Sequence, residues 1–297
     1  MSTLKSILGS RYPIVQGPVG ALNHPPLVAA ICEAGAFGML ALGFISEPGQ
    51  VKELIGKVKD LTDKPFGANL MLMNPATPAI LETLAGAGIK TVTTSTGNPK
   101  AVYPVIHDLG MKGLHVLLSV EHARRAEDAG VDGIVVSGAE SGGLRSTKTE
   151  LSTMVLVPLV ADTVKVPIVA AGGIADSRGY RAALALGAAG VQVGTRLIAS
   201  SESPAPEVWK KAITGCGESD TCLLPLGKMR MRVISGEKLK KELEDPSISL
   251  DGAYNLMNAP EAWNTGNFDL FPAGGGQVSA LIAEIKTVRD IIEEMVS

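Results

Sequence analysis

The sequence predicts an α/β fold, a (β/α)8 TIM barrel with a C-terminal lid segment. Short apolar runs rich in Val, Ile and Ala, typical of strands buried on both faces, alternate with helical segments from Tyr12 to Ser201. Eight such strands are expected, and that count favours a closed barrel. An open doubly wound sheet is the alternative. However, Gly17-Pro18-Val19-Gly20 after the first strand does not match the G-x-G-x-x-G turn of such sheets.

The expected strands and helices follow one another without interruption in this part of the chain. The strands are placed at 12–16, 36–40, 66–71, 91–94, 113–118, 133–136, 166–171 and 189–193. The helices are placed at 25–34, 48–59, 78–87, 99–109, 120–129, 151–163 and 177–186. Asn23 is the expected cap of the first helix, because two prolines follow in a first-turn position. Asp176 or Ser177 is the expected cap of the last.

The last two expected strands end in glycine turns, Gly172-Gly173 and Gly194-Thr195. Because neighbouring parallel strands end at the same edge, these turns bring free backbone N–H groups together. In a (β/α)8 barrel, the loops after strands seven and eight are a usual phosphate site. The two turns therefore predict a seat for a phosphate-bearing ligand.

The βα pattern stops after Ser201, and residues 215–276 resemble a loop with short helical pieces such as 238–244. We therefore predict a barrel formed by 1–214 and 277–297, with a last helix at 277–295. Residues 215–276 are predicted to be a lid or substrate segment over its mouth. Within it, Lys228, Arg230 and Arg232 alternate along an extended stretch. They indicate either a phosphate clamp, for NAD(P)H or a pantetheine-linked acyl group, or a solvated face.

Composition excludes several classes of protein. The net charge is −3 with both signs mixed along the chain, which does not favour nucleic acid or an anionic membrane as partner. The three cysteines show no metal-binding spacing with histidine, so no metal is expected. No signal region and no apolar run of about 18 residues is evident, which predicts a cytoplasmic protein without a membrane span. A homodimer is compatible with the sequence.

The carboxyl ends of the expected strands carry amides, hydroxyls and glycines but few titratable groups. Glu140 is the one carboxylate among them. Such a lining suits a large cofactor held by hydrogen bonds better than acid–base work by the protein alone. We therefore expect a bound cofactor to supply the chemistry.

Four segments, PIVQGPVG, AAGGIADSRG, GAAGVQVGTRLIASSE and GGGQVSALI, resemble those of the flavin-dependent nitronate monooxygenases (2-nitropropane dioxygenases) and the related FMN-dependent enoyl-acyl-carrier-protein reductases. The resemblance covers nearly the whole chain and implies a barrel that binds FMN non-covalently. It implies that backbone N–H groups of Gly172, Gly173, Gly194 and Thr195 hold the FMN phosphate. Around the rest of the cofactor it places Gln16, Gly17, Pro18, Asn69, Gly142, Gly143, Ala171, Gln192, Gly275 and Gln277.

One position departs from that family. The resemblance implies a loop of the form G-x-E-A-G-G-H after the sixth strand, with its histidine beside the flavin. This chain has GAESGGL there, so Leu144 stands at the histidine position, and leucine cannot donate, accept or carry a proton. Any reaction that needs a proton from this position is thereby disfavoured.

Three other side chains are candidates for chemistry. Arg145 is a fixed cation that could hold an anionic substrate or a cofactor phosphate, or form an ordinary loop salt bridge. His24 follows the first strand and either faces the barrel mouth or lies on the surface near a helix start. Glu140 matches an acidic position of the family and is interpreted as structural or cation-binding before catalytic. His115 is placed near the start of its strand and His122 on a solvated helix, away from the chemistry.

Three functions remain open at this point. An FMN-dependent oxidoreductase that oxidises a small anionic substrate, such as an alkyl nitronate, with O2 is favoured, because such a substrate is already deprotonated. An NAD(P)H-dependent FMN reductase of an enoyl thioester or quinone is the alternative, and it usually needs a proton donor. A barrel isomerase or synthase acting on a phosphorylated metabolite without FMN, or a non-catalytic flavin-binding protein, belongs to another class.

Overall fold

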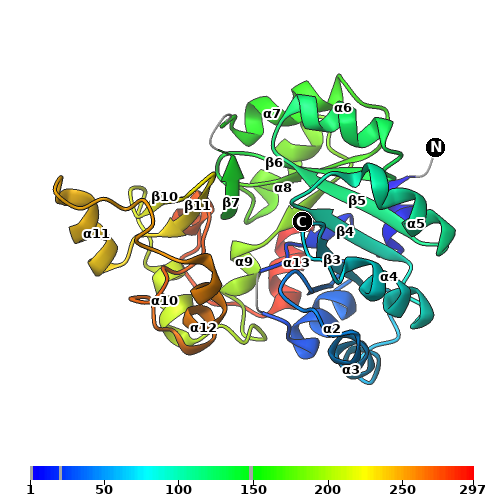
Figure 1. Ribbon diagram of the computed structural model, residues 1–297, viewed down its shortest axis with the longest axis horizontal. Coiled ribbons are helices and arrows are strands. Elements are labelled where there is room, and N and C mark those ends of the chain that lie inside the picture. Colours follow the sequence, from blue (N-terminus) through cyan, green and yellow to red (C-terminus); the bar gives the residue numbers. More distant parts are fainter. Residues whose placement is uncertain (1–2, 20–21, 147–149) are drawn as a thin grey trace.

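The computed structural model describes residues 3–19, 22–146 and 150–297. In this part of the chain, eight parallel strands form one sheet in the order β1-β9-β8-β6-β5-β4-β3-β2 (Figure 1). The strands are β1 (Ile14–Gln16), β2 (Met39–Ala41), β3 (Gly67–Met71), β4 (Thr91–Ser95), β5 (Lys112–Leu117), β6 (Gly133–Ser137), β8 (Ile168–Ala171) and β9 (Gly190–Val193). The barrel closes where Val15 bridges to Phe37 in parallel. The predicted (β/α)8 barrel is confirmed.

Helices cover the outside of the barrel. They are α1 (Leu4–Leu8), α2 (Pro25–Glu33), α3 (Pro48–Lys59), α4 (Thr77–Gly86), the 3-10 turn η1 (Pro99–Ala101), α5 (Tyr103–Asp108), α6 (Val120–Asp128), α7 (Thr153–Ala161), α8 (Ser177–Ala185) and α13 (Val288–Val296). Asp176 caps α8 as predicted. The predicted cap of α2 is wrong, because His24 holds that place. Asn23 instead pairs with both backbone groups of Ala41, at 2.6 and 2.7 Å, which ties the loop after β1 to β2.

Side chains alternate between two apolar layers along each strand. Leu114 and Val135 pack in the inner layer on the barrel axis, which α1 closes at the amino-terminal end with Leu4 and Leu8. Leu117 and Val136 point the other way, into the larger layer between strands and helices. Because strand residues alternate, the faces of neighbouring positions on one strand can be assigned from these two layers.

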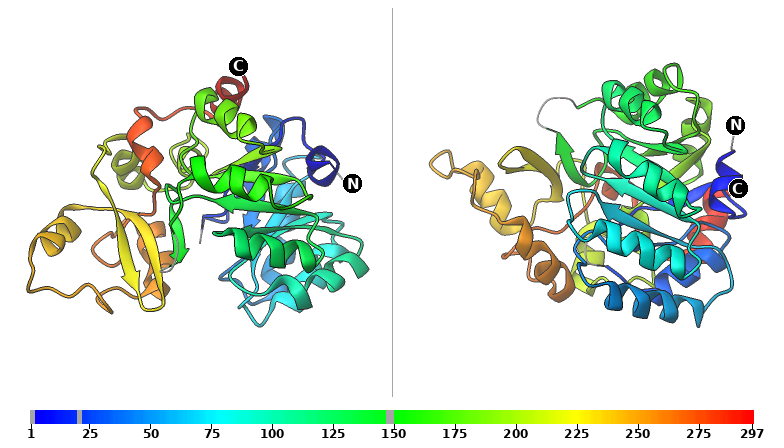
Figure 2. Two further views of the ribbon diagram at one scale, coloured as in Figure 1. Left: turned by 90° about the horizontal axis from the view of Figure 1, so that it is seen from above. Right: turned by 45° about the vertical axis from the view of Figure 1, so that its right-hand side comes forward.

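A second sheet lies beside the barrel mouth. β7 (Gly143–Ser146), β10 (Thr221–Leu226) and β11 (Met229–Ile234) pair antiparallel in the order β10-β11-β7. In Figure 2, β10 and β11 (yellow) lie next to β7 (green) on the side of the barrel where the segment 215–276 is found. The expectation of a loop after the sixth strand and over 215–276 is therefore wrong in part, because β7, β10 and β11 lie there. β7 is only four residues long, and its strand geometry comes from pairing with a distant hairpin rather than from its own propensity.

The segment 215–276 also carries helices, and it packs around a core of its own. Its helices are α11 (Glu237–Glu244), η2 (Leu256–Asn258) and α12 (Ala259–Thr265). The helices that flank it are α9 (Thr195–Ile198), α10 (Glu207–Thr214) and η3 (Gln277–Leu281). Trp209 and Trp263 lie with ring centroids 5.4 Å apart at the centre of this second core. Each indole N–H is satisfied, by Gly274 O at 2.8 Å and by Pro272 O at 2.9 Å. Since Trp209 belongs to α10, the second core begins before residue 215.

The predicted last helix at 277–295 is broken into two parts. Residues 277–281 form the turn η3, and α13 begins only at Val288. Between them Ser200 bridges to Lys286, and Ser201 N donates to Lys286 O at 2.9 Å. This pairing requires extended backbone, so it interrupts the helix, and Thr287 then caps α13 by accepting from Asp290 N.

Candidate active site

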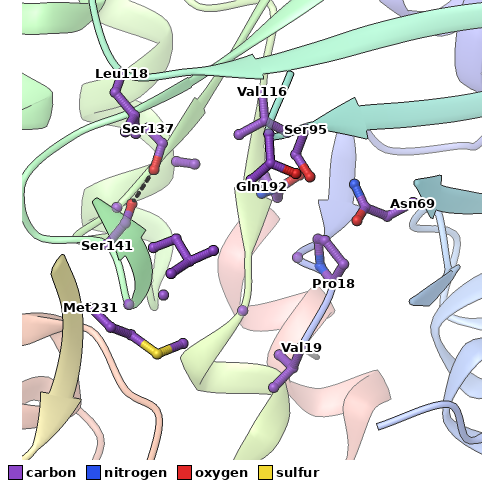
Figure 3. Close-up of a pocket in the computed structure, with 18 of the residues that line it drawn as sticks. Pro18, Val19, Asn69, Ser95, Val116, Leu118, Ser137, Ser141, Gln192 and Met231 are labelled. Atoms are coloured by element: carbon purple, nitrogen blue, oxygen red, sulfur yellow. Dashed lines mark hydrogen bonds between the residues drawn. The ribbon is translucent and has the colours of Figure 1, made fainter. Parts of the chain in front are cut away.

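A cavity of about 700 Å3 opens at the carboxyl ends of the barrel strands, between the barrel and the second sheet. Figure 3 shows Asn69, Ser95, Val116 and Gln192 of the barrel on one side of it and Met231 of β11 on the other. The cavity therefore has a barrel wall and a wall built from the C-terminal part of the chain. A volume of this size is in the range of cofactor and ligand sites.

The sequence-predicted cofactor residues converge on this cavity, with two exceptions. It is lined by Gly17, Pro18, Asn69, Gly142, Gly143, Ala171, Gly172, Gly173, Gln192, Gly194, Thr195 and Gly275. Gln16 does not line it: its side-chain Oε1 accepts from Met39 N at 2.8 Å inside the barrel wall. Gln277 has an exposed side chain, and only its backbone N contacts the site, donating to Glu140 O at 2.9 Å.

The two glycine turns have the predicted geometry for close approach of a ligand. Gly172 and Gly173 adopt φ values of 104° and 75°, which L side chains rarely adopt. A Cβ on Gly172 would lie 2.6 Å from Ser141 Oγ, whereas a Cβ on Gly194 would meet no atom within 4 Å. In the described part of the chain, the N–H groups of Gly172, Gly173 and Gly194 donate to no other residue. They remain available to an anion.

Two amide side chains face the same cavity from opposite strands. Asn69 Nδ2 donates to Thr93 Oγ1 at 2.9 Å, which fixes the amide on β3. Gln192 Oε1 on β9 is buried and has no hydrogen-bond partner among the described residues. A buried acceptor without a donor costs about 1–3 kcal/mol, so Gln192 fits a site whose ligand supplies a hydrogen-bond donor.

The loop after β6 is held against the C-terminal segment by backbone contacts. Gly276 N donates to Thr195 Oγ1 at 3.0 Å. A Cβ on Gly276 would lie 2.6 Å from Glu140 O, and one on Gly142 would lie 3.0 Å from Gly276 N. Only glycine permits this spacing. The contacts join the glycine turn after β9 to the loop after β6 and to the C-terminal part of the chain.

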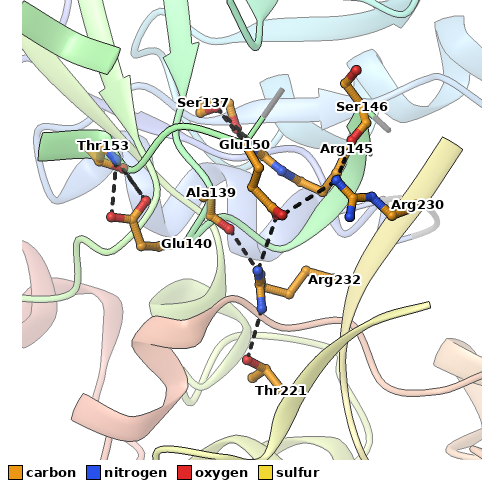
Figure 4. Close-up of polar contacts among 10 residues, drawn as sticks. All are labelled: Ser137, Ala139, Glu140, Arg145, Ser146, Glu150, Thr153, Thr221, Arg230 and Arg232. Carbon is orange, nitrogen blue, oxygen red and sulfur yellow. Dashed lines mark hydrogen bonds and ion pairs between the residues drawn. The ribbon is translucent and has the colours of Figure 1, made fainter. Parts of the chain in front are cut away.

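Glu140 is engaged in holding that loop. Its carboxylate accepts from Thr153 N at 2.8 and 3.1 Å and from Thr153 Oγ1 at 2.9 Å (Figure 4). Thr153 Oγ1 in turn contacts Gly172 O at 3.0 Å. Glu140 therefore links the loop after β6, the start of α7 and the turn after β8. Among the described residues, the side-chain hydrogen bonds of Glu140 all go to Thr153 and hold the structure of this loop.

Arg145 does not reach the cavity. Leu144 and Ser146 line it, while Arg145 between them points to the opposite face of β7. There its guanidinium is 2 % exposed and donates to Ser137 Oγ at 3.0 Å and to Ser137 O (Figure 4). Burial lowers the pKa of Arg145 to about 10, which still leaves it charged at neutral pH. Through these hydrogen bonds Arg145 stabilises the start of the loop after β6.

The alternating basic residues of the C-terminal segment are divided between the two faces. Arg230 and Arg232 lie near Glu150, with N–O distances of 3.5 and 3.4 Å, on the face that Arg145 also occupies. Lys228 is exposed and lines the cavity. The structure thus places a pair of the predicted clamp residues in an internal ion-pair network and leaves Lys228 at the mouth.

The histidines lie differently from what the sequence indicates. His24 caps α2, accepting from Leu27 N at 3.3 Å; burial lowers its pKa, and it is not part of the cavity wall. His115, expected at the wrong end of its strand, lies in the second half of β5 and lines the cavity, as does His122. His115 Nδ1 lies 2.8 Å from Thr94 Oγ1, and burial lowers its pKa to about 4. Placing β5 correctly from Lys112 onward would have revealed His115.

Two further properties bear on the class of site. Among the described residues, no cluster of three or more His, Cys, Asp or Glu side chains could hold a metal ion. In the same ranges, no helix has the length and apolar character needed to span a membrane.

Comparison with known proteins places these features in a family. The sequence model of the family described as nitronate monooxygenase matches residues 1–87 and 79–297. A probable nitronate monooxygenase of Staphylococcus saprophyticus is 30 % identical, over 93 % of this chain and 91 % of the relative. The solved structure of FabK from Thermotoga maritima superposes with a TM-score of 0.87 at 34 % identity, over 99 % of this chain and 95 % of that one.

A more specialised relative matches a shorter stretch. A 5-hydroxy-7a-methyl-1-oxo-octahydro-1H-indene-4-carboxyl-CoA dehydrogenase of Rhodococcus jostii is 34 % identical, over 74 % of this chain and 63 % of the relative. The match to the family model, by contrast, extends from the first residue to the last. The chain belongs to the nitronate monooxygenase family.

Proposed function

We propose that this oxidoreductase binds FMN in the cavity and oxidises a small anionic substrate, such as an alkyl nitronate, with O2. The observation that carries the proposal is that, among the described residues, no free carboxylate lines the cavity beside the glycine turns, while the lining histidines His115 and His122 belong to β5 and α6. Leu144 occupies the position where the family resemblance implies histidine. Among the described residues, Glu140 is the only carboxylate that lines the cavity, and its carboxylate accepts hydrogen bonds from Thr153.

The residues present fit FMN. The N–H groups of Gly172, Gly173 and Gly194, which have no partner in the described chain, would hold its phosphate. Asn69 and the unpartnered Gln192 would bond the polar edge of the ring system or the ribityl chain. FMN would supply the redox chemistry, taking two electrons from the substrate and passing them to O2. The protein would supply binding and orientation.

An anionic substrate suits this lining. A nitronate has already lost the proton on its reactive carbon, so its oxidation needs no protein base. Leu144, Met229 and Met231 form an apolar wall opposite the barrel strands and would keep water from the reacting atoms. Lys228 at the mouth would favour the approach of an anion.

A second function is favoured by one specific observation. The FabK structure matches this chain over nearly its full length, so the match extends over the residues of the second sheet. An NAD(P)H-dependent reduction of an enoyl thioester or a quinone would follow from that likeness. Such a reaction needs a proton from a source other than Leu144, and a quinone, which takes its protons from water, would be the easier acceptor.

The absorbance spectrum of the purified protein tests these alternatives. We expect a flavin spectrum that bleaches on anaerobic addition of propyl-2-nitronate and returns with O2. Bleaching by NADH or NADPH, with no response to the nitronate, would replace the monooxygenase by the reductase. Flavin that no donor reduces would indicate a carrier. Lack of flavin binding, even with added FMN, would overturn both oxidoreductase proposals and favour a phosphate-binding barrel isomerase.

A further inference from the structure

The cavity extends beyond the barrel into the helix layer. Val116 of β5 lies against the inner layer, so His115 and Leu117, on the other face of the strand, point outward toward the helices. Both nevertheless line the same cavity as Val116. The cavity therefore has a side compartment between β5, η1 and α6, lined by Thr96, Gly97, Asn98, Pro99, His115, Leu117, His122 and Arg125.

The side compartment holds a hydroxyl that the fold leaves without a partner. Thr96 Oγ1 is buried and makes no hydrogen bond to any residue that the structure describes. Thr96 is also the one residue other than glycine, among those described, with a positive φ, at 50°. β-branched residues rarely adopt such a backbone, and when they do the position often serves a ligand. The neighbouring His115 bonds Thr94 through Nδ1 at 2.8 Å, which leaves Nε2 for another group.

Basic side chains line the same cavity as this hydroxyl. His122 and Arg125 project from α6 into the compartment wall, and Lys228 lines the same cavity from the β10–β11 turn. Arg125 pairs with the exposed Glu121 on its own helix. Glu140, the single carboxylate among the described lining residues, is already engaged with Thr153. Among the described residues, Lys228 is thus a lining cation without an ion pair, whereas Arg125 would share its charge between Glu121 and a ligand.

We propose that the side compartment binds an anionic oxygen group, a phosphate or carboxylate, carried by the second ligand of the cavity. Thr96 Oγ1 and His115 would donate hydrogen bonds to it, and Arg125 would supply charge. The glycine turns after β8 and β9 are separate and would take the FMN phosphate. The identity of the second ligand, electron donor or substrate, rests on the proposed function; the binding of an anion at Thr96 does not.

The experiment is a calorimetric titration of the FMN-loaded protein with inorganic pyrophosphate at low ionic strength. Arg125→Gln and Thr96→Val are the test variants; valine keeps the shape and the backbone strain of threonine while removing the hydroxyl. Arg124→Gln is the matched control, because Arg124 is exposed on the same helix and does not line the cavity. We expect about tenfold weaker binding for Arg125→Gln and about fivefold for Thr96→Val, as for the loss of one hydrogen bond to a charged group. The control should bind as the unmodified protein does.

Several results would overturn the inference. Equal weakening of pyrophosphate binding by Arg124→Gln and Arg125→Gln would indicate a nonspecific electrostatic attraction rather than a binding site. Unchanged binding in both test variants would place pyrophosphate elsewhere, and no binding at all would remove the site. Repeating the titration with NADPH assigns the source. If the test variants weaken NADPH binding as much as they weaken pyrophosphate binding, the second ligand is a dinucleotide electron donor. If NADPH binding is unchanged, the anionic group is a phosphate or carboxylate on the substrate. Failure of the proposed function would appear separately, in the flavin spectrum.

Discussion

Leu144 of β7 lies directly opposite Met231 of β11, and both side chains line the cavity. The pairing joins the loop that follows the sixth barrel strand to the hairpin of the C-terminal segment. It also fixes the side-chain register, so that aliphatic groups face the cavity and Arg145 faces away. The apolar character of this wall therefore depends on one antiparallel pair outside the barrel.

Replacing Leu144 by histidine is expected to add acid–base chemistry to the site. We expect Leu144→His to retain FMN and to raise enoyl or quinone reduction by about tenfold or more, because a donor would then stand beside the acceptor. The pH profile of the flavin half-reaction should gain an apparent pKa near ~6.5. Leu144→Met is the control that keeps volume and apolarity. A profile identical to that of the control would contradict the assigned position of Leu144.

Adding a methyl group at Gly173 is expected to weaken FMN binding. The residue has φ of 75°, and a Cβ there would sit 3.6 Å from Glu140 Cβ without a clash. Gly110→Ala is the matched control, since φ is 70° and a Cβ meets no atom within 4 Å. Both variants should lose about 1 kcal/mol of stability through backbone strain. Only Gly173→Ala should raise the Kd for FMN, by about tenfold or more, because one contact to the phosphate is disturbed. The Kd is measured by the quenching of flavin fluorescence on binding. Equal Kd values for the two variants would exclude this turn as the phosphate site.

Glu140 is expected to be a positioning residue rather than a proton carrier. Glu140→Gln keeps one acceptor for Thr153 but loses the charge-assisted bonds, so unfolding free energy should fall by about 1–2 kcal/mol. The Kd for FMN should rise because the turn at Gly172 contacts the same threonine. With FMN at saturation, kcat and its pH profile should match those of the unmodified protein. A large loss of kcat under those conditions would assign Glu140 to the chemistry.

Stability should fall on the acid side because of His115. Its folded-state pKa of about 4 lies below the ordinary value near 6.5, so it stays neutral where the unfolded chain takes up a proton. Above pH ~6.5 His115 is neutral in both the folded and the unfolded protein, so it does not change the free energy of unfolding. Between pH ~6.5 and ~4 the free energy of unfolding declines by up to about 3 kcal/mol. His115→Gln should flatten that decline in urea titrations between pH 7.5 and 4.5. Parallel curves for the two proteins would mean that His115 titrates normally.

The barrel could be predicted from the sequence because each strand carries a local apolar signal. The glycine turns at Gly172 and Gly194 were predicted for a related reason, since a turn at a strand end is a local feature. β7 could not be predicted, because its strand geometry depends on pairing with β11, far along the chain. Residue types also failed to show that Arg145 faces away from the cavity, which follows from the register of that pairing.

The hydrogen bonds from Gly276 to Thr195 and from Gln277 to Glu140 cross between the two hydrophobic cores. We call the contact between the two cores at these hydrogen bonds the seam. A ligand bound at the turn of Gly194 would therefore contact this seam rather than one core alone. A ligand that binds more tightly when these hydrogen bonds are formed also favours the state in which they are formed. By thermodynamic linkage, a change that breaks these hydrogen bonds lowers the affinity for the ligand by the same factor by which the ligand stabilises them. Amide protons along this seam would then exchange more slowly once the cofactor is loaded, even though neither core changes its own packing.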